Sequence, residues 1–186
     1  MLQRVRQFYR AVFASIDEKD RAFISRYLDE KGQKLFFSMQ IYDQRHVLNV
    51  AYTAQALVQD LMKDCLIINI DKNLLIKSCL LHDIGRNAED FCLLDKVINV
   101  LMAYFLPNLS RMLAQKASLY KNAKRNFFKR RQYALYIYYN HAQIGAEILM
   151  DNNMKEIAEL VRYHHDLPKE NEREELKILR RADELN

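Results

Sequence analysis

An apolar, helix-like pattern ends in the doublet His82–Asp83 within the stretch Cys79–Arg86, whose sequence is CLLHDIGR. Two ionisable side chains at the end of a buried segment are costly, because an unpaired charge removed from water destabilises a fold by several kcal/mol. The doublet therefore needs a partner that compensates for this cost. Any fold of this chain has to bring that partner to the doublet.

The chain is poor in the residues that make turns. Its 186 residues include three glycines and two prolines, while Leu, Ala, Lys, Arg and Glu fill long periodic stretches. The turns of sheets and long loops rely on glycine and proline, so their scarcity predicts an all-α fold. Half of the residues are hydrophobic, which is enough for the core of one domain over 1–186.

Apolar residues at helical spacing predict a compact bundle of helices. Four helices are expected near 2–15, 20–32, 43–61 and 72–84. A pair of helices separated at Pro107 is expected within 96–139. Three more are expected, one that begins near Asn140, one over 155–165 and one over 174–186. Gly32 and Gly85 are expected to end the helices that they follow, and Asp43 is expected to cap the next helix.

The cysteines and the apolar runs indicate the compartment. Cys65, Cys79 and Cys92 form no CxxC pair and lie within apolar helical patterns, so we expect them to be reduced core residues. The first residues are amphipathic, and no run approaches the roughly 20 apolar residues that cross a bilayer. A cytoplasmic location is therefore expected.

The net charge of +5 is unevenly distributed. The segment 96–146 holds nine of the 29 basic residues and no acidic residue, which leaves 20 basic and 24 acidic residues for the rest of the chain. This basic segment, with its helical insertion at 96–139, is compatible with a solvated face, with a wall that guides an anionic substrate, or with a patch for nucleic acid or an anionic membrane surface. Its aromatic residues, such as Phe127 and Phe128, could stack on bases, but aromatic residues at such spacing more often pack a helix against a core.

The histidines of the chain form a pattern of their own. Each stands at an end of the apolar stripe of a predicted helix, and none is expected at the surface: His46, His82, His141, His164 and His165. Asp83 and Asp183 lie on comparable faces, so converging helix ends would bring up to seven metal ligands to one point. The sequence therefore predicts a metal centre.

The types of these ligands indicate the metal. Imidazole and carboxylate groups without thiolates suit Fe, Mn, Zn, Co or Ni, and Mg is also compatible. Seven ligands are too many for one catalytic ion that keeps a position open for water. Two divalent ions about 3.5 to 4 Å apart would use them all, and such a pair can lower the pKa of a bridging water and bind a phosphoryl group.

The order of the ligands resembles the HD superfamily of metal-dependent phosphohydrolases, which is named for a His-Asp doublet. The matching elements are His46, then LLHDIG with the doublet, then RRADEL with Asp183. The stretches NHAQIGAEIL and RYHHD resemble the binuclear branch of that superfamily. The resemblance extends from about Asp43 to the C-terminus and implies a helical bundle of the HD-domain type.

The resemblance also implies a role for each ligand. One ion would be held by His46, His82, Asp83 and Asp183. Asp83 would bridge to a second ion, held by His141 and by His164 or His165. His164 is favoured, because neighbouring residues of a helix project about 100° apart and both side chains are then not expected to reach the same ion. The alternative, equally compatible with the sequence, is that His165 instead binds the second ion or a phosphate.

Two departures from the superfamily pattern bear on the substrate. Members that cleave cyclic dinucleotides carry a Gly-Tyr-Pro motif after the double histidine, whereas HHDLPKENERE follows here, so that activity is not expected. Many members have a lysine after HDIG, whereas this chain has Arg86, which is expected to bind a phosphate. The candidate catalytic residues are Asp83, as the bridging ligand, and Arg86, as the phosphate-binding residue.

The function implied by the resemblance is hydrolysis of a phosphomonoester, phosphodiester or phosphoanhydride, of a nucleotide, by a metal-activated water. Two other interpretations remain open. One is a metal-containing sensor or scaffold that binds a partner or an anionic surface. The other is a di-iron oxygenase, since a small branch of the superfamily uses the same ligands for oxygen chemistry.

Overall fold

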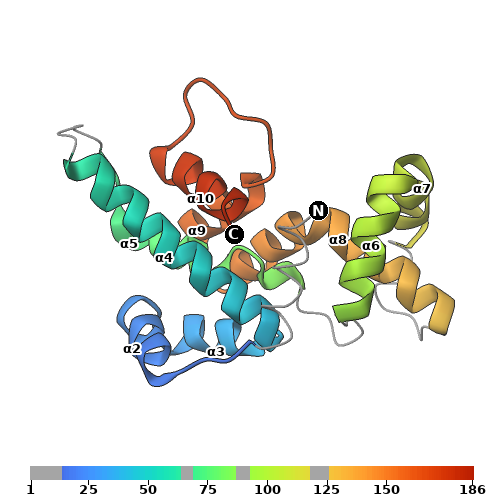
Figure 1. Ribbon diagram of the computed structural model, residues 1–186, viewed down its shortest axis with the longest axis horizontal. Coiled ribbons are helices and arrows are strands. Elements are labelled where there is room, and N and C mark those ends of the chain that lie inside the picture. Colours follow the sequence, from blue (N-terminus) through green and yellow to red (C-terminus); the bar gives the residue numbers. More distant parts are fainter. Residues whose placement is uncertain (1–13, 64–68, 87–92, 118–125) are drawn as a thin grey trace.

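The computed structural model describes residues 14–63, 69–86, 93–117 and 126–186, and among these it contains nine α-helices, one short 3-10 helix and no strand. In chain order, the elements are α2 (Glu18–Tyr27), α3 (Glu30–Ser38), α4 (Ile41–Lys63), α5 (Lys72–Leu81), η1 (Ile84–Arg86), α6 (Leu93–Phe105), α7 (Pro107–Ala117), α8 (Phe127–Asp151), α9 (Lys155–Tyr163) and α10 (Glu174–Glu184) (Figure 1). The predicted all-α fold is confirmed.

Helix α5 lies at the centre of the bundle. It packs against α2, α3, α4, α9 and α10, and its residues Leu75 and Leu80 are fully buried. The core continues through leucines such as Leu48, Leu160 and Leu179 on the surrounding helices. The doublet at the end of α5 therefore sits where several helices meet.

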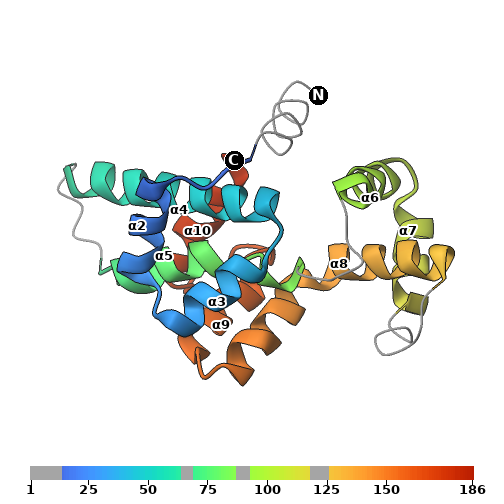
Figure 2. The same cartoon turned by 90° about the horizontal axis from the view of Figure 1, so that it is seen from below.

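The long helix α8 connects this bundle to a separate group of helices. Its second half packs against α9 and η1, whereas its first half packs with α7 and α6 to one side of the bundle (Figure 2). We call α6, α7 and the part of α8 at 127–140 the arm. The expected helix pair around Pro107 forms part of it, because α6 ends at Phe105 and α7 begins at Pro107.

One predicted helix, from Asp20 to Gly32, is wrong. The chain leaves α2 at Leu28, whose backbone is extended with φ −105° and ψ 131°. Asp29 then caps a new helix, because its side chain accepts a hydrogen bond from the backbone N–H of Gly32 at 2.8 Å. Gly32 thus lies in the first turn of α3 and does not end a helix.

Two further predicted helix starts are wrong. Helix α8 runs without a break through Asn140, whose side-chain amide donates to the carbonyl of Tyr136 at 2.8 Å and so is satisfied within the helix. Helix α4 begins at Ile41, so Asp43 is a buried residue of its first turn and not its cap.

Some expectations lie outside the described residues. These are the helix near 2–15 as far as residue 13, the cysteines Cys65 and Cys92, and the basic residues Lys121, Lys124 and Arg125. Cys79 is described; it is free and buried, and burial raises the pKa of its thiol. None of the described helices is both long and apolar enough to cross a membrane.

A buried carboxylate joins α2 to α4. Asp20 pairs with Arg45 and accepts a hydrogen bond from the hydroxyl of Tyr52 at 2.8 Å. Arg45 also donates from Nε to the carbonyl of Ser15 at 2.9 Å. The guanidinium next to His46 therefore belongs to the scaffold that supports this part of α4.

Replacing Asp20 with alanine is expected to lower the free energy of unfolding at pH 7 by about 2 kcal/mol, because Arg45 then loses its carboxylate partner. Burial raises the pKa of Asp20, but Arg45, the backbone N–H of Asp17 and the hydroxyl of Tyr52 together outweigh burial, and the net pKa is lowered. The contribution of Asp20 is therefore present above the unfolded-state pKa of about 4 and is lost as the pH falls through the folded-state pKa.

Urea unfolding at pH 7 and in acid measures both effects. The matched control is Asp60→Ala, which removes the carboxylate of an exposed ion pair with Lys63 and is expected to cost less than about 1 kcal/mol. An Asp20→Ala variant as stable at pH 7 as the control would contradict the structural role of Asp20.

Candidate metal centre

The His82–Asp83 doublet lies in the turn between α5 and η1. Helix α5 ends at Leu81, and both side chains of the doublet are fully buried. The turn closes with a hydrogen bond from the backbone N–H of Arg86 to the carbonyl of Asp83 at 2.9 Å. The helix thus ends three residues earlier than predicted, and the doublet belongs to a turn that faces the other helices.

Gly85 allows this turn to press against α8. A Cβ atom on Gly85 would lie 2.0 Å from the carbonyl oxygen of His141 and 2.6 Å from the backbone nitrogen of Gly145. Gly85 does not have the positive φ of a helix-ending glycine, so its expected role as a helix stop is wrong. Its role is a close approach between two backbones, which brings Asp83 next to His141.

Three buried histidines are oriented in the same way. The Nδ1 atom of each lies within hydrogen-bonding distance of the carbonyl three residues earlier: 2.9 Å for His82, 3.0 Å for His141 and 2.6 Å for His164. A carbonyl only accepts, so Nδ1 carries a proton, and in the neutral ring Nε2 keeps the lone pair. Within the part of the chain that the structure describes, Nε2 of His82 and Nε2 of His164 have no hydrogen-bond partner.

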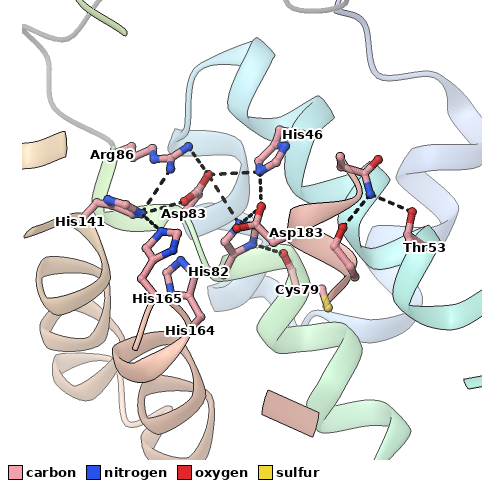
Figure 3. A network of polar contacts seen from close by, with 12 residues as sticks. His46, Thr53, Cys79, His82, Asp83, Arg86, His141, His164, His165 and Asp183 are labelled. Atoms are coloured by element: carbon pink, nitrogen blue, oxygen red, sulfur yellow. Dashed lines mark hydrogen bonds and ion pairs between the residues drawn. The ribbon is translucent and has the colours of Figure 1, made fainter. Parts of the chain in front are cut away.

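The predicted ligands form two groups on either side of Asp83 (Figure 3). Within each group the ligand atoms lie within 4.8 Å of one another; the groups are His46, His82 and Asp183, and His141, His164 and His165. A third set at this distance, His82, Asp83 and His164, joins the two groups through Asp83. Asp83 Oδ2 lies 3.6 Å from Nε2 of His46 and of His82, whereas Oδ1 lies 3.4 Å from Nε2 of His141. The structure thus brings all seven predicted ligands together, and Asp83 presents one oxygen to each group.

The adjacent histidines follow α9, which ends at Tyr163. The two side chains do not diverge as the 100° projection predicts, because the ring centroids of His164 and His165 lie 3.9 Å apart. His165 Nε2 lies 2.9 Å from His141 Nε2, so both neighbours face His141. His164 is buried but His165 is exposed, so the expectation that no histidine lies at the surface is wrong for His165.

Arg86 balances the charge of Asp83. Its Nη1 atom lies 2.6 Å from Asp83 Oδ2, and its Nη2 atom lies 3.3 Å from His141 Nε2. Burial raises the pKa of Asp83, but Arg86 and the surrounding histidines outweigh burial and hold this pKa well below its usual range. Asp83 is therefore a buried anion in the space between the two groups.

The surroundings give the histidines different protonation states. Burial lowers the pKa of His82, but Asp83 and Asp183 outweigh it and raise this pKa to about 9. Burial and the nearby His82 lower the pKa of His164 to about 3, and burial and Arg86 lower that of His141. His141 and His164 are thus neutral at pH 7, which is the form that binds a metal ion.

These residues fit a divalent metal. The donors are imidazole nitrogens and carboxylate oxygens, and each buried imidazole fixes its free nitrogen through a hydrogen bond on the opposite side of the ring, as metal-binding histidines do. Buried nitrogen atoms without a partner are otherwise costly, and a bound ion would satisfy them. The donor set favours Fe, Mn, Zn, Co or Ni.

The comparison with family models decides the family. The model described as Cas3, HD domain, matches residues 42–185. The chain belongs to the Cas3 HD-domain family. The match includes every predicted ligand and the arm, and it confirms the resemblance to the HD superfamily, whose members are generally hydrolases that bind divalent metals. No curated protein and no solved structure matches the chain.

Sequence reasoning missed the close contact that assembles the site. Gly145 on α8 faces Gly85, and a Cβ atom on Gly145 would lie 3.2 Å from the backbone nitrogen of Gly85. A signal for this contact exists in the sequence. Two of only three glycines lie within four residues of a candidate ligand, since Gly85 follows Asp83 and Gly145 follows His141.

Proposed function

We propose that the site binds two divalent metal ions. One would be held by His46, His82, Asp83 and Asp183, and the other by Asp83, His141 and the adjacent pair His164 and His165. The observation that carries this proposal is the position of Asp83, which presents one carboxylate oxygen to each group of ligands. Bound ions of this kind act as Lewis acids on phosphate oxygens and activate water.

We infer that the reaction is hydrolysis of a phosphoester or phosphoanhydride of a nucleotide or nucleic acid. Membership of the Cas3 HD-domain family favours a phosphodiester within a nucleic acid. Asp83 would hold both ions, and Arg86 would bind the substrate. The Arg86 guanidinium lies beside both Asp83 and His141, and its planar fork matches two oxygens of a phosphate once metal ions neutralise Asp83.

A cleavage assay tests the reaction class. The purified chain, loaded in turn with Mn²⁺, Fe²⁺, Co²⁺, Ni²⁺ and Zn²⁺, is incubated with labelled single-stranded oligonucleotides, dinucleotides and mononucleotides, while dissolved oxygen is recorded. Metal-dependent release of shorter products or of phosphate, with no oxygen uptake, supports the proposal. Oxygen consumption without cleavage would support the oxygenase instead, and bound metal without either activity would support a sensor or scaffold.

The two-ion arrangement predicts an unequal effect of removing one ligand. His141→Ala is expected to lower the metal content from about two ions per chain to about one, because His46, His82, Asp83 and Asp183 remain. Elemental analysis of the purified variant measures this directly. The control is Gln143→Ala, an exposed position of the same helix, which is expected to keep both ions. Loss of both ions, or of neither, in His141→Ala would contradict the assignment.

A further inference from the structure

The arm extends away from the bundle that holds the candidate ligands (Figure 2). Helices α6 and α7 pack on each other and on α8, and none of the seven candidate ligands lies within the arm, since His141 follows it on α8. The arm is therefore not required to build the metal centre. A surface that extends from the bundle in this way is accessible to a large partner.

The arm exposes an unusual amount of apolar side chain. Half of the sixteen large hydrophobic residues that are exposed in the described part of the chain belong to it: Leu101, Tyr104, Phe105, Leu106, Leu109, Met112, Phe127 and Phe128. Phe105 is 69% exposed and Phe128 is 76% exposed. Isolated exposed apolar residues are normal, but a concentration of this kind marks an interaction surface.

The exposed residues of α6 and α7 follow one another around a corner. Leu101, Tyr104 and Phe105 have the i, i+3, i+4 spacing that places them on one face of α6. Leu106 forms the connection to α7, where Leu109 and Met112, three residues apart, are also exposed. We call these six residues the apolar corner.

The charge of the arm narrows the choice of partner. Arg111 and Lys116 of α7 are exposed next to the apolar corner, and Asp95, near the start of α6, is the one acidic residue in the sequence of the arm. Two copies docked through this face would bring like charges together, which disfavours a symmetric dimer. The partner that fits by charge is therefore an anionic one.

The type of apolar side chain distinguishes between two anionic partners, a nucleic acid and a lipid membrane. A single-stranded nucleic acid is bound mainly through aromatic rings that stack on its bases, and side chains such as Leu101, Leu106 and Met112 add little to that stacking. A lipid surface accepts aromatic and aliphatic side chains at its interface and attracts nearby cations to its headgroups. Four of the six residues of the apolar corner are aliphatic, which favours lipid.

We propose that the apolar corner of the arm inserts into the interfacial region of an anionic membrane, while Arg111 and Lys116 contact its headgroups. This is peripheral binding on the membrane surface, and it does not depend on the reaction that the metal centre catalyses. The metal centre would then work beside a membrane surface, held there by the arm.

The absence of tryptophan from the chain allows a direct test. In the full chain, Phe105→Trp creates a single tryptophan at the apolar corner, and Met62→Trp creates one at an equally exposed position on α4, since Met62 is also 69% exposed. Vesicles of phosphatidylcholine, with and without phosphatidylglycerol, are added to each. We expect the emission of Phe105→Trp to shift to shorter wavelength only with the anionic vesicles, and that of Met62→Trp to stay unchanged. No shift in either variant would overturn the proposal.

Charge and apolar variants provide the second measurement, by vesicle co-sedimentation. Replacing Phe105 and Leu106 together with serine, or Arg111 and Lys116 together with glutamate, is expected to weaken binding to anionic vesicles by about tenfold or more. The control Lys34→Glu alters an exposed cation of α3 and is expected to bind anionic vesicles nearly as well as the unmodified chain. Equal binding by all variants would overturn the proposal, as would binding of single-stranded oligonucleotides, or self-association, through the same residues without vesicle binding.

Discussion

Asp83→Asn is expected to remove both metal ions and to lower the rate of hydrolysis by about a thousandfold or more. Asp83 is the one predicted ligand whose two oxygens face different groups. Asparagine replaces one of those oxygens with an NH2 group, which does not bind metal, and removes the negative charge. Even residues that only support metal ligands change affinity or activity by about 10- to 100-fold when they are replaced, so a shared ligand has a larger effect. Metal content and turnover are measured on the same preparation.

The control for this variant is Asp166→Asn, which changes an exposed carboxylate shortly after the adjacent histidines. It is expected to keep both ions and full activity. Circular dichroism confirms that both variants are folded before they are compared. A folded Asp83→Asn variant that retained two ions and normal turnover would show that Asp83 is not a shared ligand.

Gly85→Ala is expected to lower the free energy of unfolding by about 3 kcal/mol. The added Cβ would lie 2.0 Å from the carbonyl oxygen of His141, and backbone atoms of a packed helix cannot move aside as a flexible side chain can. The variant relieves the clash only by separating η1 from α8. That movement also separates Asp83 from His141, so the second group of ligands should bind metal more weakly.

The control for Gly85 is another glycine of the same chain. Gly32→Ala places a Cβ 3.2 Å from side-chain atoms of Leu28, and alanine is the better helix residue, so the change in stability is expected to stay within about 1 kcal/mol. Urea denaturation of both variants measures the difference. If Gly85→Ala were as stable as Gly32→Ala, the close approach of η1 and α8 would not be needed for the fold.

The features that could be predicted from the sequence are those set by periodicity and by residue type. Helical spacing and the lack of glycine and proline predict an all-α fold, and Pro107 marks the boundary between α6 and α7. The positions of the histidines and aspartates at helix ends predict that they converge, and the structure brings them together. These inferences depend on side-chain chemistry, which the sequence states directly.

Two kinds of feature could not be predicted: those where a helix cap competes with a continuing helical pattern, and those that depend on tertiary contacts. Asp29 starts a new helix at a position where the apolar spacing continues, and Gly85 serves a contact with a helix more than fifty residues away in the chain. Arg45 pairs with Asp20 across two helices, which no spacing indicates. The orientation of each histidine depends on the carbonyl three residues earlier, and this becomes visible only when the ends of the helices are known.

The central claim is that seven side chains form one centre for two metal ions. The most direct test counts the ions by elemental analysis of the chain, purified without a chelating tag and with air excluded. We expect about two ions per chain, of Fe, Mn, Zn, Co or Ni. A folded chain that binds no metal, even after incubation with these ions, would mean that the histidines are structural, and it would contradict the metal centre and the proposed hydrolysis together.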